Sequence, residues 1–100
     1  MNSLTLLKCI CDDTRFRMLE LLQKNREMCV NDLVSELKRE QPLISHHLRA
    51  LKQCGIVRSR ENGKMTMYSI ANKEISHLIN EITKASKRIV MICEDPACCS

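Results

Sequence analysis

The chain has 100 residues, with sixteen lysines and arginines against twelve aspartates and glutamates, so its formal net charge is +4. This length is typical of one small domain, and the mild positive charge permits a nucleic-acid partner without requiring one. Only Phe16 and Tyr68 are aromatic, which argues against single-strand binding through stacked bases. No segment approaches the roughly 20 apolar residues of a membrane span, and the first residues lack a secretory-signal pattern. We therefore expect a cytoplasmic protein with no membrane partner.

The chain is predicted to open with two helices. The first covers roughly residues 3–11, and the second covers about 13–24 and carries an apolar face formed by Phe16, Leu19 and Leu22. A third, short helix is predicted within residues 29–37. We expect Asn31 to be its N-cap and Asp32 to favour its positive end, ahead of the i, i+4 pair Leu33 and Leu37.

The next segment, residues 41–53, has the pattern of a recognition helix. Pro42 suits a first helical turn, and Gly55 suits a left-handed stop. One stripe is apolar apart from a histidine that we expect to be structural, and it consists of Ile44, His47, Leu48 and Leu51. The opposite face has no acid and consists of Gln41, Ser45, His46, Arg49, Lys52 and Gln53. Its short distance from the preceding helix is typical of a helix-turn-helix.

A basic hairpin is predicted downstream. The strand-like runs 56–60 and 65–70 flank the sequence Glu61-Asn62-Gly63-Lys64, and Asn-Gly between two such runs is a strong hairpin signal. Its cationic residues suit a wing that follows a phosphate backbone, and they are Arg58, Arg60 and Lys64. Two helices, a turn and a basic hairpin together predict a winged helix-turn-helix, mainly α with a small β-hairpin wing.

The last predicted helix starts near Asn72, a suitable N-cap, and runs for about 20 residues. Its apolar residues recur at alternating spacings of three and four, at Ile75, Leu78, Ile82, Ala85, Ile89 and Ile92. Such a heptad seam suits packing against a second copy of the chain. The alternative is a helix packed on its own domain.

Four segments, in this order and spacing, resemble the ArsR/SmtB family of small dimeric winged-helix repressors: residues 11–19, 44–51, 55–57 and 63–70. Asp13 departs from the family's usual proline, and Glu40 stands where a serine or threonine often caps the recognition helix. The resemblance implies a homodimer that represses a resistance or homeostasis operon at double-stranded operator DNA. An enzyme is not expected, because His46 and His47 belong to the recognition helix and only His77 remains for a cysteine–histidine pair.

We accordingly expect a single domain with dimerisation helices in 1–24 and 72–93, a helix-turn-helix in 30–55, a wing in 56–70 and a cysteine-rich tail in 93–100. The residues expected to bind DNA are Gln41, Ser45, His46, Arg49, Lys52, Arg58, Arg60 and Lys64. Those of the helix are expected to read base edges, mainly through Ser45, His46 and Arg49, and those of the wing to hold phosphates.

The seven cysteines are expected to be reduced, because their number is odd and the chain has only two glycines and two prolines. Cys54 is expected to be a packing residue. The tail gathers three thiols around Asp95-Pro96, namely Cys93, Cys98 and Cys99. Soft thiolates select soft ions, so we expect an inducer such as As(III), Cd(II), Pb(II) or Zn(II) there. The alternative for this segment is a frayed tail.

A second location is suggested by the resemblance. Residues 27–33 are similar to the region that holds the ligands of arsenic and cadmium/lead sensors, with Cys29 kept and the second thiol replaced by Asn31. A site there would join Cys9 or Cys11 of one chain to Cys29 of the other. Two other functions stay open: a thiol redox or persulfide switch on the same scaffold, and a winged-helix module that binds protein.

Overall fold

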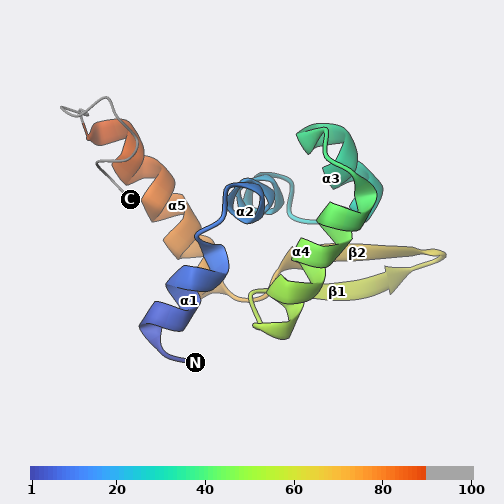
Figure 1. The fold of residues 1–100 in the computed structure, drawn as a ribbon, viewed down its shortest axis with the longest axis horizontal. Coiled ribbons are helices and arrows are strands. Elements are labelled where there is room, and N and C mark those ends of the chain that lie inside the picture. Colours follow the sequence, from blue (N-terminus) through green and yellow to red (C-terminus); the bar gives the residue numbers. More distant parts are fainter. Residues whose placement is uncertain (90–100) are drawn as a thin grey trace.

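The computed structural model describes residues 1–89, which contain five helices and one two-stranded antiparallel sheet (Figure 1). The order of these elements confirms the expected fold class. The elements are α1 (Ser3–Ile10), α2 (Asp13–Asn25), α3 (Val30–Leu37), α4 (Gln41–Gln53), β1 (Val57–Asn62), β2 (Met65–Ile70) and α5 (Lys73–Arg88).

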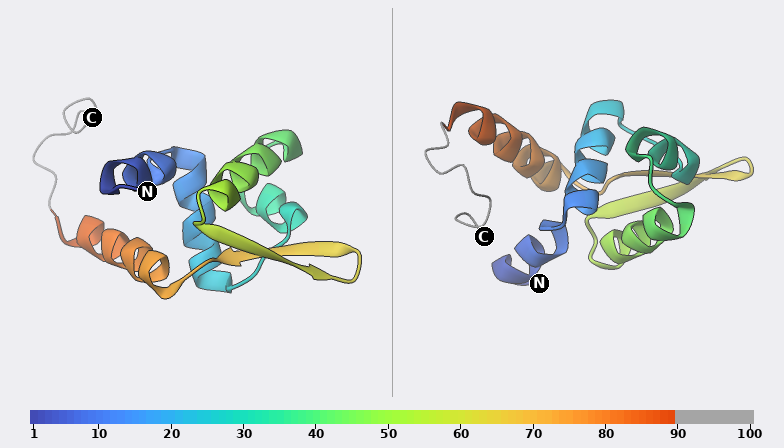
Figure 2. Two further views of the ribbon diagram at one scale, coloured as in Figure 1. Left: turned by 90° about the horizontal axis from the view of Figure 1, so that it is seen from below. Right: turned by 45° about the horizontal axis from the view of Figure 1, so that its top comes forward.

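The helices α2, α3, α4 and the start of α5 enclose the core, and the hairpin projects from one end of the molecule while α1 and α5 lie towards the other (Figures 1 and 2). None of the helices in the described range combines the length and the apolarity that a bilayer span needs. The side chains that are almost completely buried are Met18, Leu19, Leu22, Leu33, Ile44, Leu48, Leu51, Ile56 and Ile79.

The start of α3 differs from the expectation. The N-cap is Cys29 rather than Asn31, which is already helical, and the Asp32 carboxylate accepts a hydrogen bond of 3.1 Å from the backbone N–H of Cys29. An acid at the third helical position that reaches back to the cap is half of a capping box. The prediction was wrong because the Asp32 carboxylate, inside the helix, accepts the hydrogen bond of the Cys29 backbone N–H. A capping side chain at position 31 is therefore not needed.

Both ends of α4 agree with the sequence. Glu40 is the N-cap and makes no side-chain cap hydrogen bond, as its departure from serine or threonine predicts. At the other end Gly55 has a φ of +77°, and the N–H groups of Gly55 and Ile56 donate to the carbonyls of Lys52 and Leu51 at 3.0 and 2.9 Å. These two bonds form a Schellman motif, which ends the helix at a fixed place.

The wing turns one residue later than the Asn-Gly signal indicates. Asn62 pairs with Met65, so the two loop residues are Gly63 and Lys64. Gly63 has a φ of +65°, whereas Lys64 is not among the residues with positive φ, which is the pattern of a type II′ turn. Glycine at the first loop position satisfies this turn without strain.

The last helix is shorter than predicted, at 16 residues, and Ile89 beyond it has extended backbone. Its most buried residues are Ile75 and Ile79, at 8 and 1% exposure, and both pack in the core of the chain itself. Ile79 was not part of the predicted seam; it lies one helical turn after Ile75 and faces the core with it, while the seam itself stays a prediction. Ile92 lies outside the described residues.

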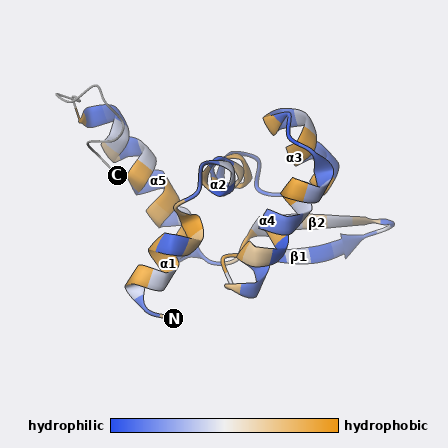
Figure 3. Ribbon diagram, viewed as in Figure 1, coloured by the Kyte–Doolittle hydropathy of each residue, from blue (hydrophilic) through white to orange (hydrophobic). Residues whose placement is uncertain are grey.

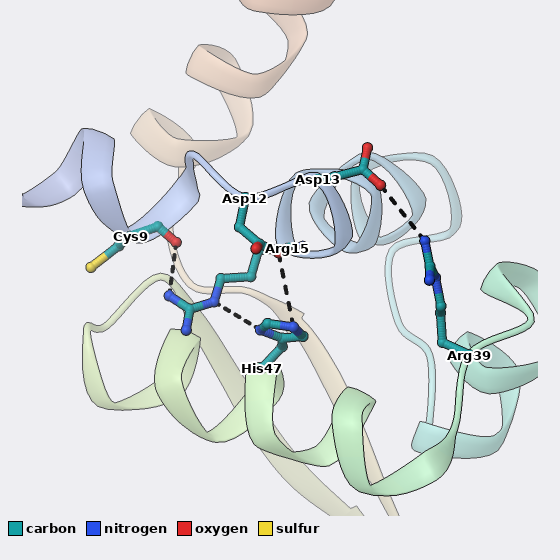
Figure 4. A network of polar contacts seen from close by, with 6 residues as sticks. All are labelled: Cys9, Asp12, Asp13, Arg15, Arg39 and His47. Carbon is teal, nitrogen blue, oxygen red and sulfur yellow. Dashed lines mark hydrogen bonds and ion pairs between the residues drawn. The ribbon is translucent and has the colours of Figure 1, made fainter. Parts of the chain in front are cut away.

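A polar network fixes how α4 lies against the rest of the domain (Figure 4). Arg15 on α2 donates from Nε to Nδ1 of His47 at 2.9 Å, and its Nη1 donates to the carbonyl of Cys9 at 3.3 Å. Asp12, the N-cap of α2, lies 3.9 Å from Nε2 of His47. One guanidinium thus connects the end of α1, the start of α2 and the middle of α4, which supports the structural role expected for His47.

The geometry requires a neutral imidazole, because Nδ1 of His47 accepts the hydrogen bond from Arg15 and the ring proton must then be on Nε2. Burial lowers the pKa of His47, and the nearby Arg15 acts in the same direction while Asp12 opposes both. The pKa of Asp12 is itself lowered, mainly by the hydrogen bond that its carboxylate accepts from the backbone of Arg15. The network therefore favours a neutral histidine beside an ionised aspartate.

The lowered pKa of His47 predicts a loss of stability on acidification. The folded protein holds this proton less tightly than the unfolded chain, so the stabilisation is complete above the unfolded value of 6.5 and is lost as the pH falls towards the folded pKa. We expect the thermal midpoint to fall between about pH 7.5 and about pH 5.5. The variant His47→Gln keeps an acceptor for Arg15 and should lose this part of the pH dependence; an unchanged profile would contradict the assignment.

Candidate nucleic-acid interface and cysteine sites

The outer face of α4 is open to solvent along its length. Gln41, His46, Arg49 and Lys52 are exposed, and Ser45 is half-buried. The stripe behind them is buried, with exposed fractions of 0 to 8% for Ile44, His47, Leu48 and Leu51. The five polar side chains on this face offer hydrogen-bond donors and two full positive charges to a partner in the groove of a duplex.

Leu43 lies at the edge of this polar face and is 38% exposed. Its position on the helix falls between the two stripes, so the apolar and polar spacings assign it to neither face. An exposed apolar group on a recognition helix is of the kind that contacts the methyl group of thymine. Leu43 therefore adds an apolar element to a face that is otherwise polar.

The wing is held near the middle of its strands by two contacts with the loop between α2 and α3. Met28 and Tyr68 exchange two backbone hydrogen bonds, of 3.0 and 2.8 Å. Arg60 donates from Nε and Nη2 to the two carboxylate oxygens of Glu27 at 2.6 and 2.8 Å. This bidentate pair lowers the pKa of Glu27 and raises that of Arg60. Its geometry fixes orientation more than it adds stability, since the pair is partly exposed.

The three basic residues expected in the wing therefore differ in their surroundings. Arg60 is engaged by Glu27, a partner that the sequence analysis missed because the two are 33 positions apart. Arg58 donates to the Ser69 hydroxyl at 3.4 Å and is exposed, and Lys64 is exposed at the turn. β1 and the tip of the wing are mostly hydrophilic (Figure 3).

The described residues contain four free cysteines, and the structure brings two of them together. The Sγ atoms of Cys9 and Cys54 are 2.8 Å apart, whereas Cys11 is exposed and Cys29 is buried. Cys54 was expected only to fill space, and its partner on α1 was missed. The three tail cysteines Cys93, Cys98 and Cys99 lie outside the described residues.

Within residues 1–89 of one chain, no three histidine, cysteine or acidic side chains come together in a way that could hold a metal ion. Cys9 is half-buried on α1, whereas Cys11 follows the helix as its non-helical C-cap and is exposed. A soft-ion site that uses three thiols therefore needs either the tail or a second chain.

Comparison with known proteins places the chain in a family. Residues 12–59 match the family model described as bacterial regulatory protein, arsR family. The chain is 44% identical over 80 residues to an uncharacterised HTH-type transcriptional regulator of Methanocaldococcus jannaschii, which covers 77% of this chain and 90% of the relative. It is 36% identical over 77 residues to the arsenical resistance operon repressor of Staphylococcus xylosus, covering 77% of this chain and 72% of the relative.

Comparison with solved structures agrees with this family assignment. HlyU from Vibrio cholerae matches with a TM-score of 0.79 at 27% identity, over 86% of this chain and 92% of that protein. The AntR antimony-specific transcriptional repressor matches with a TM-score of 0.72 at 25% identity, over 85 and 80%. A homodimeric winged helix-turn-helix DNA-binding domain from Mycobacterium bovis matches with a TM-score of 0.74 at 25% identity, over 80 and 73%. The chain belongs to the ArsR family, and it is a DNA-binding transcriptional repressor with a winged helix-turn-helix.

Proposed function

We propose that the protein represses transcription as a homodimer on a pseudo-palindromic operator, and that a thiophilic metal or metalloid ion bound by cysteines releases it. The observation that carries the DNA-binding part is the face of α4, where polar and basic side chains point to solvent above a fully buried stripe. A helix held so firmly on one side can present the other side to a major groove in one orientation.

The residues of α4 are proposed to read the bases. Arg49 is exposed and suits a bidentate contact with guanine, while Gln41, Ser45 and His46 supply further donors and acceptors. The contacts with DNA phosphates are assigned to cationic residues of α4 and the wing, namely Lys52, Arg58 and Lys64. Arg60 is assigned mainly to positioning the wing, because the pair with Glu27 uses the Nε–H and one N–H of Nη2 and fixes the guanidinium in place.

The proposed dimer interface uses α1 and α5, which lie at the end of the molecule away from the wing (Figure 2). Leu4 and Leu7 on α1 are 60 and 50% exposed, and Ile89 after α5 is 67% exposed. A domain of this size gains stability by covering such residues with a second copy. Dimerisation through this end would leave both recognition helices and both wings accessible to DNA.

The inducer is proposed to be a soft ion such as As(III), Cd(II), Pb(II) or Zn(II). Two of the relatives are named for arsenical and cadmium resistance, and one structural neighbour is named for antimony. The sites that remain are the tail cysteines Cys93, Cys98 and Cys99, which we favour because three thiols lie within seven positions. The alternative site joins Cys9 or Cys11 to Cys29 of the second chain; with Cys9 beside Cys54, Cys11 is the more accessible ligand.

Two substitutions separate base reading from phosphate binding. Arg49→Ala should weaken operator binding by about 1–3 kcal/mol and relax specificity at one position of each half-site. Lys64→Ala should weaken binding to all sequences alike and reduce the slope of log K against log salt by roughly 1. Fluorescence anisotropy with operator and scrambled duplexes over a salt series measures both. Unchanged discrimination by Arg49→Ala would refute the assignment of the recognition face.

A charge on the outer face of α1 should break the dimer. Leu7→Lys would bury an unpaired ammonium in the proposed apolar interface, so light scattering should give the monomer mass of 11.6 kDa instead of twice that value. Thr5→Lys, an exposed position of the same helix, is the matched control and should remain dimeric. A wild-type protein that is monomeric and still binds the full operator tightly would contradict the proposal.

Removal of the residues after Ile92 locates the inducer site. The shortened protein should bind the operator normally but resist release by As(III) or Cd(II), because it lacks Cys93, Cys98 and Cys99. Anisotropy of the DNA complex during anaerobic titration measures release. If the shortened protein is released at the same ion concentration as the full chain, the tail assignment is wrong. Cys29→Ser should then abolish release.

A further inference from the structure

Two thiols that are 45 positions apart in the chain meet between α1 and the end of the recognition helix. The Sγ atoms of Cys9 and Cys54 are 2.8 Å apart, and both side chains are half-buried, so they are neither sealed in the core nor freely solvated. The sulfur atoms of a disulfide are about 2.05 Å apart, which leaves about 0.8 Å to close. A movement of this size lies within ordinary side-chain adjustment.

The backbone holds each thiol in place. On α1, Leu6, Cys9 and Ile10 share the side that packs against the domain, while Cys11, the residue after the helix, is exposed. Cys54 is the C-cap of α4, and the Schellman hydrogen bonds of Gly55 and Ile56 fix that end of the helix. The two cysteines are therefore paired by the fold and do not depend on a mobile segment.

We propose that Cys9 and Cys54 are an oxidation site that forms a reversible intrachain disulfide and thereby ties α1 to the recognition helix. The oxidant is hydrogen peroxide. In the first step one thiolate attacks the peroxide, an S–O bond forms as the O–O bond breaks, and a sulfenic acid and one water result. The second thiol then attacks the sulfenic sulfur, an S–S bond forms as the S–O bond breaks, and a second water leaves.

Hydrogen peroxide accepts the electrons that the two thiols lose. The two thiols lose two electrons and two protons, and hydrogen peroxide is reduced to two waters. An external dithiol reverses the reaction by exchange through a mixed disulfide. No metal or cofactor is required for either direction.

The local environment makes this a slow site rather than a highly reactive one. The hydrogen bond with Cys54 is the main cause that raises the pKa of Cys9; burial adds to it, and Arg15 on α2 opposes it. A raised pKa lowers the fraction of thiolate, which is the form that attacks the peroxide. Cys54 and Arg15 are the titratable and charged groups that act on Cys9 from the elements packed against it.

The bond would act on DNA binding through α1, a consequence that rests on the proposed function. The outer side of α1 carries Leu4 and Leu7 of the proposed dimer interface, and its inner side meets the end of α4. The covalent link would fix the end of α4 to α1, so the recognition helix could no longer adjust its position relative to that interface when it meets an operator. Two half-sites one helical turn apart tolerate little change in the spacing of their helices, so oxidation should weaken operator binding.

Mapping of the cross-links tests the site directly. The reduced full-length protein is treated with hydrogen peroxide, remaining thiols are alkylated, and the protein is digested without reduction for mass spectrometry. We expect the peptides of Cys9 and Cys54 to be linked as the dominant product within one chain and to separate on addition of dithiothreitol. The proposal would be overturned if the dominant links joined other cysteines. It would also be overturned if Cys9 and Cys54 were both still open to alkylation while Cys11 was oxidised.

Matched serine variants keep the test independent of the other thiols. Cys9→Ser and Cys54→Ser should each abolish the link and leave the remaining partner open to alkylation, whereas Cys11→Ser should form the link like the wild type. Closing a loop between positions so far apart restricts the unfolded chain, so the oxidised wild type should melt at a higher temperature than the reduced protein. An equal rise in Cys54→Ser would show that another bond is responsible.

Operator affinity tests the coupling separately. Oxidised wild type and oxidised Cys11→Ser should bind the operator several-fold more weakly than their reduced forms, and oxidised Cys54→Ser should bind as its reduced form does. If the link forms and the affinity is unchanged, the coupling to α4 is refuted while the oxidation site stands. Failure of the reduced protein to bind the operator would count against the proposed function instead, because that form contains no disulfide.

Discussion

The packing of α4 against the core is the constraint on which the rest of the structure depends. Ile44, Leu48 and Leu51 are at most 1% exposed, and each buried aliphatic side chain contributes roughly 1.5–3 kcal/mol. The single bond from the charged Arg15 guanidinium to His47 is worth about as much as one of these side chains, roughly 1.5–3 kcal/mol, because it replaces bonds to water. The apolar stripe therefore supplies most of the energy, and the polar bond selects the rotation at which the outer face points to solvent.

The wing depends on a second, smaller junction. Glu27 and Met28 lie in the loop that joins α2 to α3, and they contact Arg60 and Tyr68 of the hairpin by an ion pair and by backbone hydrogen bonds. The next residue, Cys29, is the N-cap of α3. One short loop thus positions the start of the helix-turn-helix and the middle of the wing together, so a disturbance there reaches both parts of the DNA-reading half.

The opposite end of the molecule is organised differently, because only one side of α1 and of α5 packs against the rest of the domain. The inner side of α5 is anchored by Ile75 and Ile79, and the inner side of α1 by Ile10, which is 3% exposed. The outer side of α1 keeps Leu4 and Leu7 in solvent. The proposed dimer and the proposed Cys9–Cys54 bond use opposite sides of the same helix. Oxidation of the thiols and dimerisation would therefore both act on α1.

Local patterns in the sequence were sufficient for the elements: the apolar spacing of Ile44, Leu48 and Leu51, the Gly55 stop and the basic hairpin all follow from neighbours a few positions apart. Resemblance to a known family supplied the function. Only the tertiary structure decided which side chains meet, because the contacts Arg15–His47, Glu27–Arg60 and Cys9–Cys54 span 32, 33 and 45 positions. No helical or strand period relates residues so far apart, so their pairing depends on how the finished helices pack.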